Sequence, residues 1–154
     1  MPNQIIKQAL FVDAKAEKSN TTATLQISQT SLIVRQIRSG GFVEIPGKIE
    51  PIYSHNDQNF LSTTLLLHYC YQDDNERHIL KDITACCVPN GRLQDRYNPT
   101  ADISFWSAGR NALSRGEDFR VRVNFQRLCE MAAWRVQKII VDVASKTLMH
   151  NWTD

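Results

Sequence analysis

The chain has 154 residues, with 18 basic and 16 acidic side chains and a formal net charge of +2. This length is typical of one domain, and an apolar content of 42% is enough to bury a core, so we expect a single folded domain over residues 1–154. With six glycines, five prolines and four cysteines, the composition excludes collagen-like, low-complexity and disulfide-framework proteins.

The sequence predicts a cytoplasmic protein without a membrane partner. Its first residues lack the basic start and apolar core of a secretory signal peptide. No stretch reaches the roughly 20 apolar residues that a membrane span needs. All four cysteines lie in apolar segments, as reduced thiols in a reducing compartment do.

The first third of the chain is predicted to form short strands. Residues 4–12 mix apolar and polar positions without helical spacing. Residues 24–28 alternate cleanly and residues 32–37 are rich in β-branched side chains, which predicts two antiparallel strands. Residues 42–45 form a further short strand between two glycine-containing turns.

The middle of the chain contains the clearest β signal. Residues 59–72 and 78–88 are apolar segments separated by an acidic turn, which predicts a β-hairpin. Residues 92–118 contain scattered glycine and proline and are predicted to be a long connection with at most one short strand or helical turn. Residues 119–124 alternate arginine with apolar side chains and predict another strand.

The end of the chain is predicted to be one long helix. Asn124 stands where an N-cap belongs, and apolar residues then recur every three or four positions over residues 125–148 without glycine or proline. With a β-rich part over residues 1–124, the predicted fold is α+β: a curved antiparallel sheet, or a partly open β-barrel or roll, of about six or seven strands, closed by this helix. The element order is similar to that of pleckstrin-homology-type rolls, although no family motif is matched residue by residue.

Basic side chains concentrate in the second half of the chain. Residues 92–138 hold nine basic and five acidic side chains, a net charge of 9 − 5 = +4. Eight of the nine are arginines, whose guanidinium group matches phosphate geometry, and neighbouring aromatic side chains could stack on bases. This pattern predicts a surface for RNA or single-stranded DNA. The residues predicted to form it are Arg92, Arg96, Arg110, Arg115, Arg120 and Arg122.

One local motif has the form of a nuclease site. Asp13-Ala14-Lys15 places a lysine next to a carboxylate, as metal-dependent nucleases require. In the usual order of such sites a second carboxylate comes earlier in the chain, and no acidic residue precedes Asp13. We therefore interpret the motif as a solvated charge pair at the end of an edge strand, and we expect no catalytic residues.

Histidine and cysteine side chains offer a weak metal-ligand pattern. His68 and Cys70 would project from one face of a strand, and the paired strand could add a third ligand such as His78. No close-spaced double pair of ligands occurs, so we expect no metal and no other cofactor. We expect Cys70 and one of Cys86 and Cys87 in the core, with His68 and His78 at the sheet surface.

Together these features predict a non-catalytic binding module that contacts an acidic partner, with nucleic acid the leading candidate. Two alternatives stay open. In the first, the same arginines meet protein carboxylates and the chain is a structural subunit of a homo- or hetero-oligomer. In the second, the chain is a small enzyme or ligand carrier whose curved sheet encloses a pocket. The pocket would be lined by Phe60, Leu65, Leu67, Tyr69 and Ile83.

Overall fold

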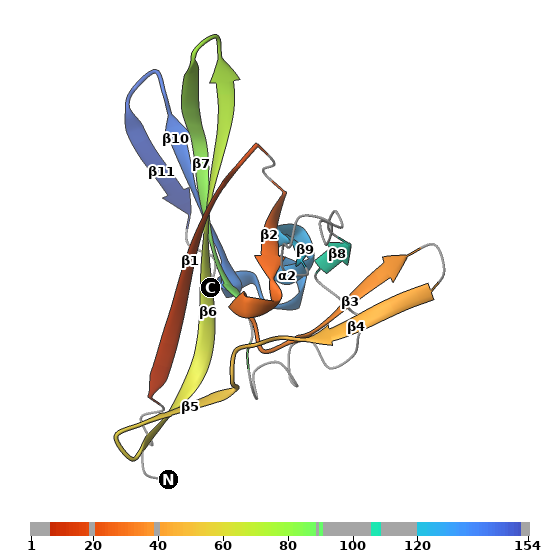
Figure 1. The fold of residues 1–154 in the computed structure, drawn as a ribbon. Coiled ribbons are helices and arrows are strands. Elements are labelled where there is room, and N and C mark those ends of the chain that lie inside the picture. Colours follow the sequence, from red (N-terminus) through yellow and green to blue (C-terminus); the bar gives the residue numbers. More distant parts are fainter. Residues whose placement is uncertain are drawn as a thin grey trace.

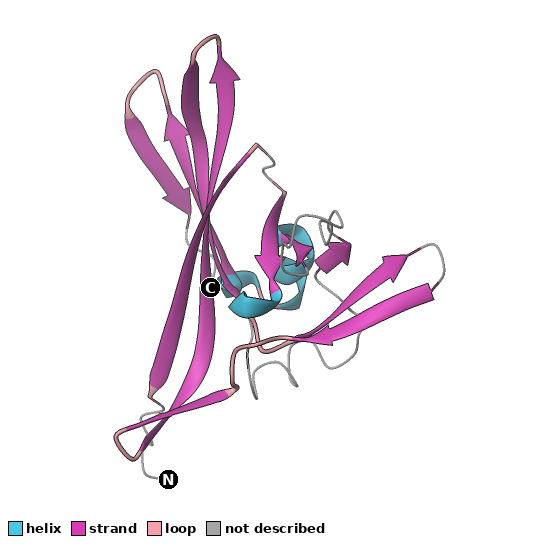
Figure 2. Ribbon diagram, viewed as in Figure 1, coloured by secondary structure: helices cyan, strands magenta, loops and turns pink. Residues whose placement is uncertain are grey.

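The structure is a computed structural model that describes residues 7–18, 21–38, 41–88, 90, 106–108 and 120–151. For residues 34–38, 41–43, 106–108, 120–121 and 151 it describes the backbone alone. These parts of the chain form eleven strands, two short 3₁₀ helices and one α-helix (Figures 1 and 2). Within them, the one α-helix is seven residues long and falls far short of the length that crosses a bilayer.

The main sheet has six strands. Its order is β1-β6-β7-β10-β11, and β5 pairs with β6 beside this path. β1 runs parallel to β6, whereas all other neighbours are antiparallel. The strands are β1 (Gln8–Glu17), β5 (Ile52–His55), β6 (Gln58–Asp74), β7 (Arg77–Val88), β10 (Val136–Asp142) and β11 (Thr147–Asn151).

The remaining elements form two smaller units. A three-stranded sheet has the order β2-β9-β8, and β3 pairs with β4 as a separate hairpin that extends away from the main sheet in Figure 1. The strands are β2 (Thr22–Gln26), β3 (Ile33–Arg38), β4 (Gly41–Pro46), β8 (Trp106–Ala108) and β9 (Arg120–Asn124). The helices are η1 (Ile27–Gln29), α2 (Phe125–Met131) and η3 (Ala133–Arg135).

The core lies between the main sheet and the layer formed by β2, β9 and α2. Leu66 of β6 and Cys86 of β7 face Leu25, Val123 and other buried side chains of that layer. We call this covered side of the main sheet its inner face, and the opposite side its outer face. Burial of this apolar cluster holds the smaller sheet on the inner face, since each fully buried aliphatic side chain contributes roughly 1.5–3 kcal/mol.

The predicted fold class is wrong. The main sheet is mixed and open, because β1 pairs in parallel and stands at the opposite edge from β11. The closing helix predicted over residues 125–148 is also wrong, since α2 ends at Met131 and the chain continues into η3, β10 and β11. The similarity to pleckstrin-homology-type rolls depended on that helix and does not hold. The N-cap prediction is confirmed, because the Asn124 side chain accepts a hydrogen bond from the Arg127 N–H at 3.0 Å.

The error in the last segment has a clear physical cause. β10 is rich in Val and Ile, which favour strands, and it carries apolar side chains on both faces, so its pattern fits helical spacing as well. The following turn contains neither glycine nor proline. Instead, Asp142 Oδ1 accepts the Ala144 N–H at 2.9 Å, and Lys146 adopts a left-handed φ of 54°.

Most of the strands predicted before residue 125 are confirmed. β6 and β7 form the predicted hairpin, and strands lie where residues 42–45 and 119–124 predicted them. Residues 24–28 and 32–37 do not pair with each other: β2 pairs with β9, and β3 pairs with β4. Of the predicted connection over residues 92–118, the described part is β8.

A buried asparagine ties the base of the β3–β4 hairpin to the main sheet. Asn90 is fully buried, and its Oδ1 accepts the Ser31 N–H at 2.9 Å. Its Nδ2 donates to Thr64 Oγ1 on β6 at 2.7 Å. These bonds join the chain before β3, the middle of β6 and the end of β7 at one point.

Replacing Asn90 with alanine should lower the free energy of unfolding by about 2 kcal/mol, because buried partners lose their hydrogen bonds. Urea unfolding measured against the wild-type chain tests this. The exposed Ser28→Ala variant in nearby η1 is the control and should be neutral. An unchanged unfolding midpoint for Asn90→Ala would show that this contact does not hold the hairpin base.

Candidate active site

Strand β1 turns its charged side chains toward the inner face. Asp13, Lys15 and Glu17 are partly buried there, whereas Leu10 and Val12 on the outer face are each 60% exposed. Alternation is normal for a strand, but a strand that merely covers a core points its apolar side chains inward. Partial burial of three charged groups costs free energy unless they are paired or used, so this reversal marks β1 as a functional strand.

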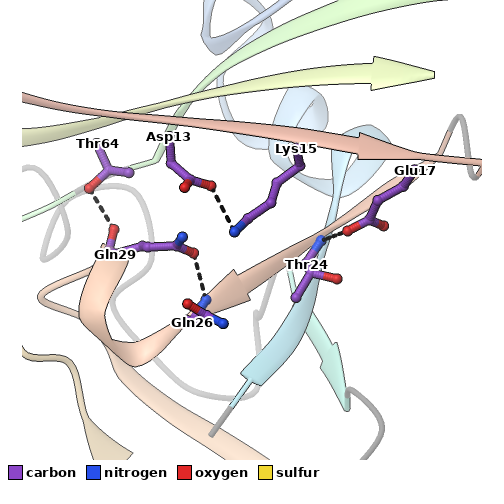
Figure 3. Close-up of polar contacts among 7 residues, drawn as sticks. All are labelled: Asp13, Lys15, Glu17, Thr24, Gln26, Gln29 and Thr64. Carbon is purple, nitrogen blue, oxygen red and sulfur yellow. Dashed lines mark hydrogen bonds and ion pairs between the residues drawn. The ribbon is translucent and has the colours of Figure 1, made fainter. Parts of the chain in front are cut away.

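Asp13 and Lys15 form an ion pair within β1. Lys15 Nζ lies 3.1 Å from Asp13 Oδ2, and the two side chains are only 21% and 25% exposed. Asp13 Oδ2 is buried from solvent. Within the described residues, it contacts the Lys15 ammonium and has no other polar partner. Figure 3 shows the two side chains leaving β1 on the same side. The predicted edge strand is confirmed, but the interpretation of a solvated pair at its end is wrong, because the pair is turned inward.

Glu17, two residues further along β1, has a different role. One carboxylate oxygen accepts the Thr24 N–H of β2 at 3.0 Å, and the other accepts Arg122 Nη1 of β9 at 2.6 Å. Burial acts to raise the pKa of Glu17, but the hydrogen bonds from Thr24 and Arg122 outweigh it and hold the pKa below its ordinary value. Glu17 therefore fixes β1 to the smaller sheet and leaves Asp13 as the available carboxylate.

A short 3₁₀ turn lies against the same part of the inner face. Thr64 of β6, the neighbour of Phe11 in β1, donates from Oγ1 to the Gln29 carbonyl at 2.7 Å. The Gln29 side chain accepts the Gln26 N–H through Oε1 at 2.8 Å. Figure 3 shows the Gln29 side chain extending into the space that Asp13 and Lys15 enter.

A row of polar side chains continues from Lys15 across the sheet. The register pairs Lys15 with His68, His68 with Thr84, and Thr84 with Lys138. His68 is fully buried, edge-on to Phe125 with ring centroids 5.3 Å apart, and neither of its ring nitrogens has a hydrogen-bond partner in the described residues. Burial lowers the pKa of His68, which favours the neutral ring.

The histidine and cysteine predictions have mixed outcomes. Cys70 and Cys86 are buried as predicted, and His78 is exposed and contacts Asp73. His68 was predicted at the surface and instead lies in the interior, because its face of β6 is covered by α2. In the part of the chain that the structure describes, no three His, Cys, Asp or Glu side chains come together as a metal site.

The predicted arginine surface lies mostly outside the described residues. Arg92, Arg96, Arg110 and Arg115 fall outside them, and Arg120 is described by its backbone in β9 alone. Arg122 pairs with Glu17 within its own chain. Nucleic-acid contact by these arginines stays a prediction.

The structure also has a cavity in the main sheet. This cavity has a volume of about 280 Å³ and opens on the outer face, where Leu65, Cys87 and Trp134 are among its lining residues. Of the five residues predicted to line a pocket, this cavity includes Leu65 and none of the other four.

A carboxylate and a lysine ammonium held together on one strand face form a donor set suited to phosphodiester cleavage. The comparisons with known proteins agree with this class of site. Residues 1–139 match the family described as type II restriction enzyme SfiI. The chain therefore belongs to the SfiI family of type II restriction enzymes.

Individual relatives support the assignment. The type II restriction enzyme SfiI of Streptomyces fimbriatus is 34% identical over 164 aligned positions, which cover 99% of this chain and 61% of the relative. The crystal structure of tetrameric restriction endonuclease SfiI bound to cognate DNA superposes with a TM-score of 0.80 and 33% identity, over 96% of this chain and 59% of that one. The chain thus spans about three fifths of the length of these relatives.

A more distant structure shares the fold. The restriction endonuclease BglI, bound to its DNA recognition sequence, superposes with a TM-score of 0.68 at 20% identity, over 86% of this chain and 54% of that one.

The prediction of a non-catalytic binding module is wrong, because the family is one of DNA-cleaving enzymes. The sequence signal that was available was the Asp13-Ala14-Lys15 motif.

Replacing Glu17 with glutamine should destabilise the fold at pH 7, because the carboxylate that Arg122 contacts is lost. Since folding lowers the pKa of Glu17, its contribution is fully present above about pH 4.3, where the unfolded carboxyl is ionised, and is lost as the pH falls through the lower pKa of the folded state.

Urea unfolding of both proteins at pH 7 and in the acidic range measures this contribution. The difference between wild type and Glu17→Gln should shrink on acidification. The exposed Glu76→Gln variant in the β6–β7 turn is the control and should be neutral at pH 7. A difference that stays constant or grows as the pH falls would contradict the role given to Glu17.

Proposed function

We propose that this chain carries the phosphodiester-cleaving site of a type II restriction endonuclease that acts on DNA, with Asp13 and Lys15 in that site. The observation that carries the proposal is the reversed polarity of β1, which holds this ion pair on the inner face while Leu10 and Val12 face outward. Family membership supports it, and the solved SfiI relative is described as bound to cognate DNA.

Lys15 would act on the charge that develops during hydrolysis. When water attacks phosphorus and the bond to the leaving oxygen breaks, negative charge accumulates on the phosphoryl and leaving oxygens. An ammonium group held in place before the reaction stabilises that charge without further reorganisation. Asp13, 3.1 Å away, holds the Lys15 side chain in that position.

Asp13 fits the role of a ligand to a hard divalent cation. Its Oδ2 is a carboxylate oxygen without a second partner in the described residues, and Mg²⁺ is commonly held by one or two carboxylates together with water and substrate phosphate. When bound, such a cation supplies Lewis-acid stabilisation of charge at the phosphate.

The predicted arginine surface keeps a place in this proposal. Arg92, Arg96, Arg110, Arg115 and Arg120 are candidates for contacts to DNA phosphates, which supply most of the sequence-independent affinity of DNA-binding proteins. Arg122 is assigned to the contact with Glu17 instead, because the two side chains are paired at 2.6 Å.

The chain should cut unmethylated phage DNA into discrete fragments in the presence of Mg²⁺, and a chelator should stop the reaction. Asp13→Asn and Lys15→Met should each lower the cleavage rate by about 100-fold or more. Gel electrophoresis with timed sampling measures this, and circular dichroism confirms that the variants fold. Absence of cleavage by the wild-type chain, or full activity in both variants, would contradict the proposal.

We also propose that the chain self-associates, because the SfiI relative is described as tetrameric. Ten large apolar side chains, among them Leu148 and Met149 of β11, are between 44% and 65% exposed in the single chain, which leaves apolar area for a subunit contact. Light scattering after size exclusion should give a mass that is a multiple of the monomer. A monomer mass at all concentrations tested would rule this out.

A further inference from the structure

The turn η1 lies along the inner side of β1. At one end, the Thr24 N–H of β2 donates to Glu17, at 3.0 Å. At the other, the Gln29 carbonyl accepts from Thr64, whose neighbour in the sheet is Phe11, two residues before Asp13. The chain from Thr24 to Gln29 therefore runs opposite to β1 and passes over Lys15 and Asp13, as Figure 3 shows.

Two hydrogen bonds hold Gln29 in place, one through its main chain and one through its side chain. Its main-chain carbonyl is held by Thr64 at 2.7 Å, and its Oε1 accepts the Gln26 N–H at 2.8 Å in a capping box. Because a backbone N–H can only donate, the amide oxygen must face Gln26, and Nε2 must point the other way. In the described part of the chain, Nε2 makes no hydrogen bond, so two N–H donors remain available at the half-buried site.

We propose that Gln29 is a further substrate-contacting residue of the Asp13–Lys15 site, and that its Nε2 donates hydrogen bonds to a DNA phosphate oxygen. The inference rests on the proposed function. A phosphate oxygen is only an acceptor, and the pair on β1 offers a single donor group, the Lys15 ammonium. The neutral Gln29 amide adds two directed donors beside the Lys15 ammonium without adding a second positive charge. Such donors orient a bound phosphate, whereas the positive charge of Lys15 attracts it.

Gln29→Glu separates this role from the structural one. Glutamate at the third position of a capping box accepts the same N–H bond as glutamine does, so the fold should be retained, while both donors are replaced by an anion. Gln72→Glu is the matched control: it adds the same charge at an exposed position near the β6–β7 turn, six residues beyond Leu66, the neighbour of Asp13.

The test measures the dissociation constant of each variant of the 154-residue chain for a fluorescein-labelled duplex by anisotropy, without divalent cation, at one fixed salt concentration. Gln29→Glu should bind about tenfold or more weakly than Gln72→Glu, as expected for the loss of a hydrogen bond to a charged oxygen. The uncharged Gln29→Met variant should also bind more weakly than wild type, and it decides the question if Gln29→Glu does not fold.

Equal binding by Gln29→Glu and Gln72→Glu, both folded by circular dichroism, would overturn the inference, as would wild-type affinity in folded Gln29→Met. These readouts need no cleavage. A wild-type chain that binds DNA without cutting it would count against the proposed function alone, whereas normal cutting with equal binding by the two glutamate variants would count against Gln29 alone.

Discussion

The parallel pairing of β1 with β6 is the constraint on which the candidate site depends. Its register places Asp13 beside Leu66 and Lys15 beside His68, and because side chains alternate along a strand, this register also decides which face each residue occupies. A shift by one residue would bring Leu10 and Val12 to the inner face and turn the charged residues to the outside. Apolar burial alone would favour that shift, so other interactions must hold the observed register.

Those interactions come from segments far apart in the sequence. Glu17 binds the backbone of β2 and the guanidinium of β9, 105 residues away. Thr64 links the middle of β6 to the carbonyl of Gln29 and to the buried Asn90. The apolar core between the sheets supplies the general stability, and these few directed bonds select the observed register over the shifted one that apolar burial alone would favour. The same bonds that fix the fold therefore also orient Asp13, Lys15 and Gln29.

Much of the strand content could be predicted from the sequence, but the arrangement of the strands could not. The β6–β7 hairpin was predictable because its strands are adjacent and its turn is polar. The β1–β6 pairing was not, because parallel strands are joined by a long connection that leaves no local signal. β10 was mistaken for helix because both of its faces carry apolar side chains and the turn after Asp142 lacks glycine and proline. The Asp13-Ala14-Lys15 motif was visible, yet its meaning depends on which face of β1 is covered, and a single strand does not reveal this.

The central claim is that DNA meets this chain at the inner side of β1, where Asp13 and Lys15 lie. A crystal structure of the chain with duplex DNA, solved with Ca²⁺ in place of Mg²⁺, tests it most directly. The account predicts a backbone phosphate within hydrogen-bond distance of Lys15 Nζ. A complex in which the DNA lies against the outer face, next to Leu10 and Val12, or in which no phosphate approaches Lys15, would contradict it.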